Sequence, residues 1–559
     1  MKKTYYITKY WLSLQFGLFD KTNNSMQFGG AKKNKIKWKT LEHNGPMFAP
    51  LYEPHGVPIK YHGEEIVLDP ENEEIATMYA RYVETEYAKN RIFNKNFWKN
   101  WKPHLSDNHV IKNLEDVDFT LIYNHILNEK EWKKQRSKEE KEEDKRIKDE
   151  QDAKYKIAIV DGKEVDIGNF KLEPSGIFIG RGCHPKLGSI KKRIEPEDVI
   201  INIGKNAPVP KPPYGHWKDI IHDDTVEWLA SWNDSISKKP KYVWLAAHSD
   251  FKAKSDMKKF EKARKLKRRY KSIMAENNEN LKSQDPIMRQ IATAVYLIDK
   301  LALRVGGEKK EDEADTVGVT TLRVEHIELL DSNKIKLDFL GKDSIRYENT
   351  VQIDHQPYKN LEEFMSNKTM EDQLFNLISA DQVNKYLNNF MPGLSAKTIR
   401  TMHSSILFQK EMNKVINKFK NYDEDDKINV LLDQYNLINL KIALLCNHQK
   451  KISKTFNEQV DRINQQIKTQ KRLLKKAKND KNHERIKKIQ STIKRLQAKK
   501  ELKMELKNLS LNTSKQNYID PRLGVLYLRK FNLPWEKVFS KALRKKFDWA
   551  FKIEDSWTF

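Results

Sequence analysis

Residues 456–506 carry apolar side chains at alternating spacings of three and four, with a polar interruption at 479–483. The apolar positions are Phe456, Val460, Ile463, Ile467, Leu474 and Ala477, then Ile486, Ile489, Ile493 and Leu496. Two such stretches around a polar turn predict an antiparallel helical hairpin with one narrow apolar seam. Lys and Arg greatly outnumber Asp and Glu here, so the rest of its surface is basic and solvated. A bare coiled coil used for oligomerisation is the alternative.

The net charge of the whole chain points to a polyanionic partner. Lys and Arg number 104 and Asp and Glu 78, a surplus of +26 at pH 7. Such a surplus favours nucleic acid or an anionic membrane surface, although a Lys-rich soluble protein without such a partner has the same composition. An aromatic content of 10% argues against disorder, and 559 residues suggest three or four domains.

The cysteines and the hydropathy indicate an intracellular protein. Cys183 and Cys446 are too few for a disulfide framework or a four-ligand zinc site. No apolar run reaches the roughly 18 residues that a membrane span requires. We therefore expect a reducing compartment, no membrane insertion and no secretion.

The periodicity elsewhere predicts a mixed α/β fold that is predominantly helical. Residues 286–306 have the pattern of a buried helix, residues 73–93 that of an amphipathic helix, and residues 129–155 that of a long solvated helix. Two strands flank a tight turn at residues 341–344, and another hairpin turns at Asp161 and Gly162.

Two common catalytic signatures are missing. The sequence has no Walker-type loop, which disfavours ATP-driven work, and neither an HExxH motif nor a Cys/His cluster for metal-dependent hydrolysis. Several cations stand instead at the margins of apolar elements, and a tyrosine precedes Asp-Pro. These residues are Arg304, Lys342, Arg400, His448 and Tyr518. Taken singly, each is more often a structural group than a catalyst.

Eight stretches between Ile36 and Phe559 carry a family resemblance. They are IKWKTLEHNGPMFAPLYEP, KLEPSGIFIGRGCHPKLG, YLIDKLALRVGGEK, ADTVGVTTLRVEHIEL, LDFLGKDSIRY, LSAKTIRT, ALLCNHQ and TSKQNYIDPR. In this order they resemble the eukaryotic type IB DNA topoisomerases. GKDSIRY together with SKQNYIDPR is the most specific pair, because the two motifs lie far apart and belong to one active site in that family.

The resemblance implies an enzyme that nicks one strand of duplex DNA, lets it swivel and reseals it. Tyr518 would be the nucleophile and would form a 3′-phosphotyrosyl intermediate. Arg304 and Arg400 would hold the non-bridging oxygens of the scissile phosphate, with a further hydrogen bond from His448. Lys342 would protonate the departing 5′-oxygen.

These residue types suit the implied chemistry. Arginine is planar and permanently charged, so it can bind the developing negative charge bidentately. A phenol is a weak nucleophile at neutral pH but a reasonable leaving group, so strand resealing needs no ATP. Fixed cations and a histidine would take the place of a metal ion, and we expect no cofactor.

The resemblance also implies a two-lobed DNA clamp, in which a cap and a tyrosine-recombinase-like catalytic lobe surround duplex DNA. The expected parts are an N-terminal extension (1–35), the cap (36–254), the catalytic lobe (255–448), a protruding coiled-coil linker (449–512) and a C-terminal domain with the nucleophile (513–559). The expected partner is supercoiled duplex DNA, and the expected oligomeric state is a monomer. Positions that match DNA contacts of the family are Arg181, His184, Lys186, Lys259, Lys309, Thr316, Asp343, Lys397 and Asn517.

The resemblance also bears on inhibitor binding and on the cellular location of the protein. Arg181, Asp343 and Asn517 match the pocket in which camptothecin-type drugs stack in the family. Gly307 and His403 stand where many members have asparagine, and the long charged N-terminal tail of the family is nearly absent. The resemblance implies a nuclear location, but the targeting signals usually lie in that tail.

Two other functions remain open from the sequence. A tyrosine site-specific recombinase uses the same chemical logic, although the cap motifs argue against it. A catalytically inactive, basic DNA-binding scaffold would have the same charge, but all five catalytic positions hold the expected residue types.

Overall fold

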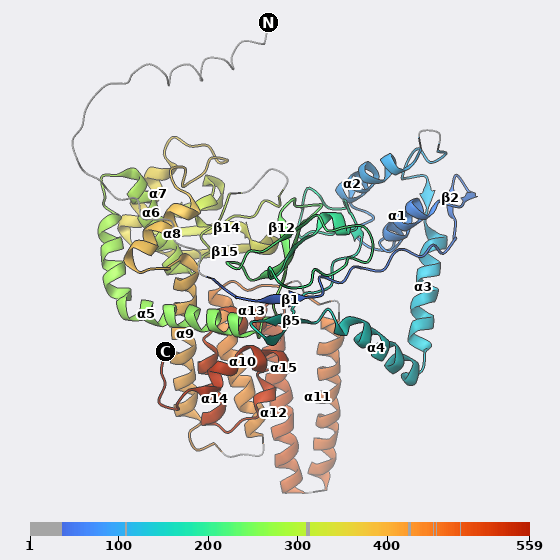
Figure 1. Ribbon diagram of the computed structural model, residues 1–559. Coiled ribbons are helices and arrows are strands. Elements are labelled where there is room, and N and C mark those ends of the chain that lie inside the picture. Colours follow the sequence, from blue (N-terminus) through green and yellow to red (C-terminus); the bar gives the residue numbers. More distant parts are fainter. Residues whose placement is uncertain are drawn as a thin grey trace, which may run out of the picture.

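The computed structural model describes residues 36–106, 109–308, 313–422, 426–450, 452–453, 455–480 and 482–559. The predicted N-terminal extension, residues 1–35, and Lys309 lie outside these residues. Within them the fold is mixed, with many helices and several small sheets (Figure 1). No described helix has both the length and the apolar character needed to cross a membrane.

A first hydrophobic core lies between residues 59 and 190 and is rich in aromatic side chains such as Phe93, Phe97 and Trp101. Its elements are β2 (Ile59–Tyr61), β3 (Glu64–Ile66), α1 (Pro70–Ala80), α2 (Arg91–Trp101), β4 (Val117–Asp118), α3 (Thr120–Gln135), β7 (Gly176–Ile177) and β8 (Ile190–Lys191). The prediction of one helix over 73–93 is wrong. Asn90 begins a second helix, because its side chain accepts from the N–H groups of Ile92 and Phe93.

The charged stretch 129–155 is likewise two helices. The chain turns at Arg136, and α4 (Lys138–Ala153) begins at a capping box in which Ser137 and Glu140 bond each other's backbone N–H groups. All of α4 except Asp152 is exposed or half-buried, as expected for a solvated helix.

A second core combines residues 38–48 with residues 158–251. Its strands are β1 (Leu41–His43), β5 (Ile157–Val160), β6 (Lys163–Asp166), β9 (Ile200–Asn202), β10 (Asp219–Ile221), β11 (Trp228–Asn233) and β12 (Pro240–Trp244). They form two sheets, in the orders β1-β5-β6 and β10-β9-β11-β12. The predicted hairpin at Asp161 and Gly162 is confirmed, and both turn residues have a positive φ.

The largest core is built from residues 263–442 together with residues 519–559, so the C-terminal residues pack into the same core as the central helices. Its elements are α5 (Asp250–Asn280), α6 (Pro286–Leu301), β13 (Ile327–Leu330), β14 (Lys334–Gly341), β15 (Ile345–Gln352), α7 (His355–Met365), α8 (Ala380–Phe390), α9 (Ala396–Lys418), α10 (Lys427–Leu445), α14 (Pro521–Lys530) and α15 (Lys541–Lys546). The short helix α13 (Leu511–Asn517) precedes the C-terminal part of this core. Short 3₁₀ turns across the described chain are Lys102–His104, Pro196–Asp198, Val319–Thr321, Val324–His326, Lys342–Ser344, Trp535–Lys537 and Asp548–Lys552.

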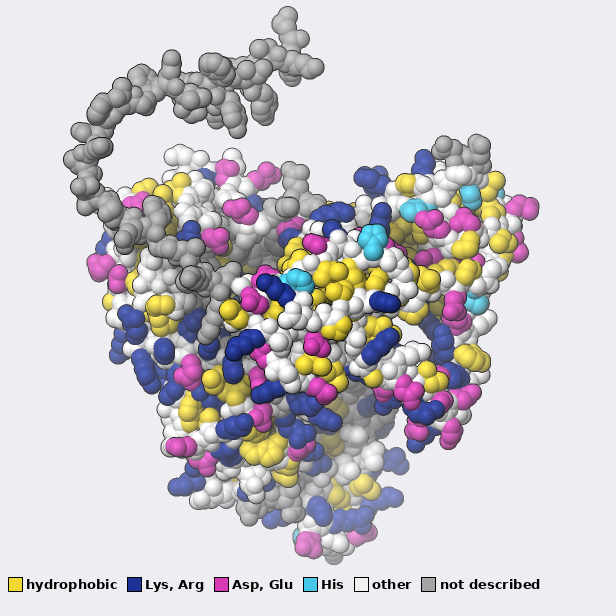
Figure 2. Space-filling model, in the orientation of Figure 1, with side chains coloured by type: hydrophobic (Ala, Val, Ile, Leu, Met, Phe, Trp, Pro, Cys, Tyr) yellow, Lys and Arg dark blue, Asp and Glu magenta, His cyan; other side chains and the backbone are white. Residues whose placement is uncertain are grey.

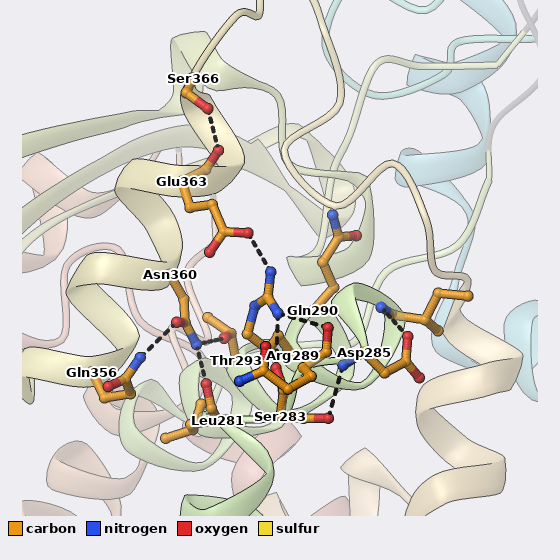
Figure 3. A network of polar contacts seen from close by, with 12 residues as sticks. Leu281, Ser283, Asp285, Arg289, Gln290, Thr293, Gln356, Asn360, Glu363 and Ser366 are labelled. Atoms are coloured by element: carbon orange, nitrogen blue, oxygen red, sulfur yellow. Dashed lines mark hydrogen bonds and ion pairs between the residues drawn. The ribbon is translucent and has the colours of Figure 1, made fainter.

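The start of α6 is held by a polar network (Figure 3). Asp285 caps the helix by accepting from the Ile287 N–H at 2.9 Å, with proline at the first helical position. Asn360 of α7 donates to the Leu281 carbonyl and to Thr293 Oγ1, both at 2.9 Å. Arg289 also forms an ion pair with Glu363. These contacts fix α6, whose other end leads directly to Arg304.

The helices α11 (Phe456–Asn479) and α12 (His483–Glu505) lie side by side and run away from α13 (Figure 1). Ala477, Ile489 and Ile493 form a small core between them. The predicted helical hairpin is therefore confirmed.

Candidate active site

Tyr518 lies at the C-terminal end of α13 and is 4% exposed. Its N–H donates to the Ser514 carbonyl at 2.9 Å, and its own carbonyl accepts from Ser405 Oγ of α9 at 3.2 Å. The same serine oxygen accepts from the Asp520 N–H at 3.1 Å. The backbone around Tyr518 is thus bonded on both sides, which fixes the direction of its side chain.

The residues after Tyr518 are anchored by a buried ion pair. Asp520, 0% exposed, binds Arg522 through both carboxylate oxygens, and Arg522 also reaches Glu261 of α5. The guanidinium packs 4.2 Å from the ring centroid of Trp557. Because removal of one partner would leave an uncompensated buried charge, this cluster holds the segment in one place.

Arg304 reaches the Tyr518 hydroxyl from the end of α6. The helix ends at Ala302, which has a left-handed φ of 50°, and Arg304 Nη1 donates to Tyr518 Oη at 3.3 Å. Just after Arg304, the backbone at Gly306 passes very close to the backbone at Gly318. A Cβ on Gly318 would lie 2.4 Å from the Gly306 Cα, so this approach requires glycine.

Arg400 lies on α9 and is 4% exposed. Its guanidinium carbon is 5.0 Å from the centroid of the Tyr518 ring, and Nη2 donates to the Cys446 carbonyl at 2.5 Å. Nε and Nη1 are buried and have no hydrogen-bond partner among the described residues. Unpaired buried donors are costly, so two donors held this way point to an anionic ligand.

His448 follows α10, after Asn447 with a positive φ of 47°. Its ring centroid is 5.1 Å from that of Tyr518, and Nδ1 is 2.7 Å from Ser514 Oγ. Burial, and then the charges of Arg400, Arg304 and Lys342, lower the pKa of His448 to about 3. The imidazole is therefore neutral at physiological pH.

We expect this buried imidazole to make the protein less stable in mild acid. The lowered pKa means that below about pH 6.5 the unfolded chain binds a proton that the folded chain does not, so stability falls with falling pH. Between pH 6.5 and 5.0, wild type should lose about 1.5 kcal/mol more unfolding free energy than His448→Gln. Urea titrations at the two pH values measure this difference. The exposed His483 supplies the control, since His483→Gln should follow wild type.

Lys342 lies in the turn between β14 and β15, as predicted. Asp343 and Ser344 beside it have positive φ values of 69° and 56°. Lys342 lines a cavity of about 100 Å³ together with Arg304, Arg400 and His448. Tyr518 is not among the residues that line the cavity, but it contacts the last three of these side chains. Side chains from five distant segments thus converge, and Lys342 is exposed.

Seven of the other predicted site residues form two further groups. Arg181, His184, Lys186, Thr316 and Asp343 line a second cavity, of about 490 Å³. In it, Arg181 pairs with Asp343, and the Ser344 hydroxyl donates to the Arg181 carbonyl at 3.3 Å. The segment that carries Arg181 therefore touches the turn that carries Lys342.

Lys259 and Lys397 line a third hollow of about 690 Å³, with Lys254, Lys258 and Lys262. Burial lowers the pKa of Lys259, against the opposing effect of Asp256. Asn517 lies next to Tyr518, and its side-chain amide donates to the Thr513 carbonyl at 3.1 Å.

Sequence reasoning missed the residues that support this site. Ser514 lies within the quoted stretch TSKQNYIDPR, one helical turn before Tyr518, and that spacing was an available signal. His403 bonds Asp299 at 2.7 Å, and Tyr270 bonds the same carboxylate at 2.6 Å, which ties α9 to α6 and α5. No sequence signal indicates that contact.

Three family descriptions match consecutive parts of the chain. Residues 36–245 match the eukaryotic DNA topoisomerase I DNA binding fragment, residues 248–481 its catalytic core, and residues 490–559 a C-terminal topoisomerase domain.

Curated relatives are similar over most of the chain. DNA topoisomerase 1 beta of Arabidopsis thaliana is 42% identical over 97% of this chain and 61% of its own length. DNA topoisomerase 1 of Caenorhabditis elegans and of Homo sapiens are each 42% identical over 93% of this chain, and over 67% and 71% of their own lengths. The chain thus spans less than two thirds of the length of the Arabidopsis relatives. It belongs to the eukaryotic DNA topoisomerase I family.

Proposed function

We propose that this protein is a type IB DNA topoisomerase, which relaxes supercoiled duplex DNA by transient cleavage of one strand. The observation that carries the proposal is the convergence on one tyrosine side chain: Arg304 bonds the Tyr518 hydroxyl, while Arg400 and His448 pack against its ring, from positions up to 214 residues away in sequence. A phenol among fixed cations suits attack on a phosphodiester.

In the proposed reaction, the phenolic oxygen of Tyr518 forms a bond to phosphorus as its proton leaves to water. The bond from phosphorus to the 5′-oxygen breaks, and Lys342 gives that oxygen a proton. Arg304 and Arg400 stabilise the charge that develops on the non-bridging oxygens. The reverse steps reseal the strand after it has swivelled, so the proposal requires neither ATP nor a metal ion.

We assign the DNA contacts to basic and polar residues of the second and third cavities, together with Lys309 and with Asn517 beside Tyr518. Lys and Arg side chains are spread over much of the face in Figure 2, in keeping with the charge of +26. Contacts to the DNA backbone should dominate affinity and make it fall steeply with salt. The proposed contact residues are Arg181, His184, Lys186, Lys259, Lys309, Thr316, Asp343, Lys397 and Asn517.

The proposal extends to the architecture. Residues 36–254 and 255–448 would form the cap and catalytic lobe of a clamp around one duplex, with 449–512 as a coiled-coil linker beside the rotating DNA and 513–559 as the domain that carries Tyr518. The protein would act as a monomer in the nucleus. Arg181, Asp343 and Asn517 would border a camptothecin-type inhibitor pocket next to the cut.

Plasmid relaxation tests the function. The purified protein, with EDTA and without ATP, should relax positively and negatively supercoiled plasmid completely. Relaxation of only one sign of supercoil would exclude a swivel mechanism. Products recombined at a specific sequence would favour a recombinase, and DNA binding without relaxation would favour an inactive scaffold.

A further inference from the structure

Ser514 joins the nucleophile to the buried imidazole. It lies on α13, one turn before Tyr518, and is 0% exposed. Its carbonyl accepts from the Tyr518 N–H, while its hydroxyl lies 2.7 Å from Nδ1 of His448. One residue thus fixes both the end of the nucleophile's helix and one nitrogen of the histidine.

The protonated nitrogen of His448 decides what the histidine can do. A neutral imidazole has one N–H group, and the nitrogen that carries it is set by the hydrogen bond at the other nitrogen. Nε2 of His448 is buried without a hydrogen-bond partner among the described residues, and the ring lines the cavity with Arg304 and Arg400. A proton on Nδ1 would leave Nε2 with a lone pair, which repels an anion.

We propose that Ser514 is a positioning residue whose hydroxyl donates to Nδ1 of His448 and thereby keeps the proton on Nε2, so that the Nε2–H group can donate a hydrogen bond to the scissile phosphate. The inference rests on the proposed function, because it requires a phosphate beside Nε2. It assigns Ser514 no contact with DNA. Its effect is transmitted only through His448.

The test is single-turnover cleavage of a duplex that ends just beyond the cut, so that the short released strand dissociates and religation is prevented. Ser514→Ala should slow cleavage about tenfold, the size expected for loss of one buried hydrogen bond. DNA affinity should be unchanged, because phosphate contacts elsewhere dominate binding. Ser514→Thr, which keeps the hydroxyl, should cleave within about twofold of wild type.

A double-mutant comparison separates this role from a general structural one. In a His448→Gln background, Ser514→Ala should slow cleavage by less than about a further twofold, because the residue through which Ser514 acts is gone. Ser510→Ala is the matched control: it lies on the turn before α13, and its hydroxyl bonds Thr513 instead of the His448 ring. This variant should cleave at the wild-type rate.

Nitrogen NMR of protein labelled with ¹⁵N-histidine gives a direct readout. The wild-type signals that are missing from the spectrum of His448→Gln belong to His448. They should correspond to an unprotonated Nδ1 and a protonated Nε2. A protonated Nδ1, or an equal effect of Ser514→Ala with and without His448, overturns the inference. If wild type relaxes plasmid while these results fail, the proposed function stands and only the role of Ser514 is lost. If wild type forms no covalent complex, the proposed function itself fails.

Discussion

Tyr518→Phe should abolish relaxation and covalent attachment to DNA, a loss of at least about 10⁴-fold in rate. Phenylalanine keeps the ring that packs against His448 and Arg400, but it lacks the oxygen that would bond to phosphorus. The fold and DNA affinity should therefore persist. Plasmid relaxation measures the activity, and rapid denaturation during turnover measures attachment, which in wild type should leave protein on 3′ ends.

Tyr527→Phe is the matched control. Tyr527 lies on α14, is 0% exposed, and donates its hydroxyl hydrogen to the Leu431 carbonyl at 2.6 Å. Its replacement should cost about 1 kcal/mol of stability and leave relaxation intact. Residual relaxation by Tyr518→Phe would mean that another group is the nucleophile. Wild-type attachment at 5′ ends would contradict the assigned polarity.

Helices with a regular spacing of apolar residues, and hairpins with a clear turn sequence, could be predicted from sequence. The apolar spacing over 286–306 gave α6, and the seam over 456–506 gave α11 and α12. The failures concern helix starts. Asn90 and Ser137 each begin a new helix within a continuous helical pattern, and Ser137 with Glu140 forms a capping box that is readable in sequence.

The residues of the candidate active site likewise fall into those that could be predicted from sequence and those that could not. Its five central residues could be named through the family resemblance, because the motifs that carry it are local in sequence. Their support could not be predicted, because the partners come from remote elements. Arg522 joins Asp520 to Glu261 of α5, and Ser405 of α9 bonds the backbone of Tyr518. Hydrogen bonds of this kind depend on how the core packs, and no spacing rule encodes them.

Arg400→Lys should slow single-turnover cleavage by about 10²- to 10³-fold, although the charge is kept. Arg400 uses Nη2 for the Cys446 carbonyl and still has Nε and Nη1 available, so one planar group can bond the protein and a phosphate together. A lysine ammonium on a flexible stem can satisfy the carbonyl or the phosphate, but it cannot hold both in that geometry. The expected loss is that of one preorganised donor to a developing oxyanion.

Arg264→Lys distinguishes this geometric requirement from a general need for arginine. Arg264 of α5 also packs over an aromatic ring, 5.4 Å from the centroid of Trp557, and bonds Glu261. It is half-buried and lies outside the three cavities, so its replacement should leave cleavage unchanged. If Arg400→Lys cleaves within about threefold of wild type, charge alone is sufficient at this position. In that case the two unpaired nitrogens of Arg400 do not bind the transition state, and the geometric role proposed for its planar guanidinium is wrong.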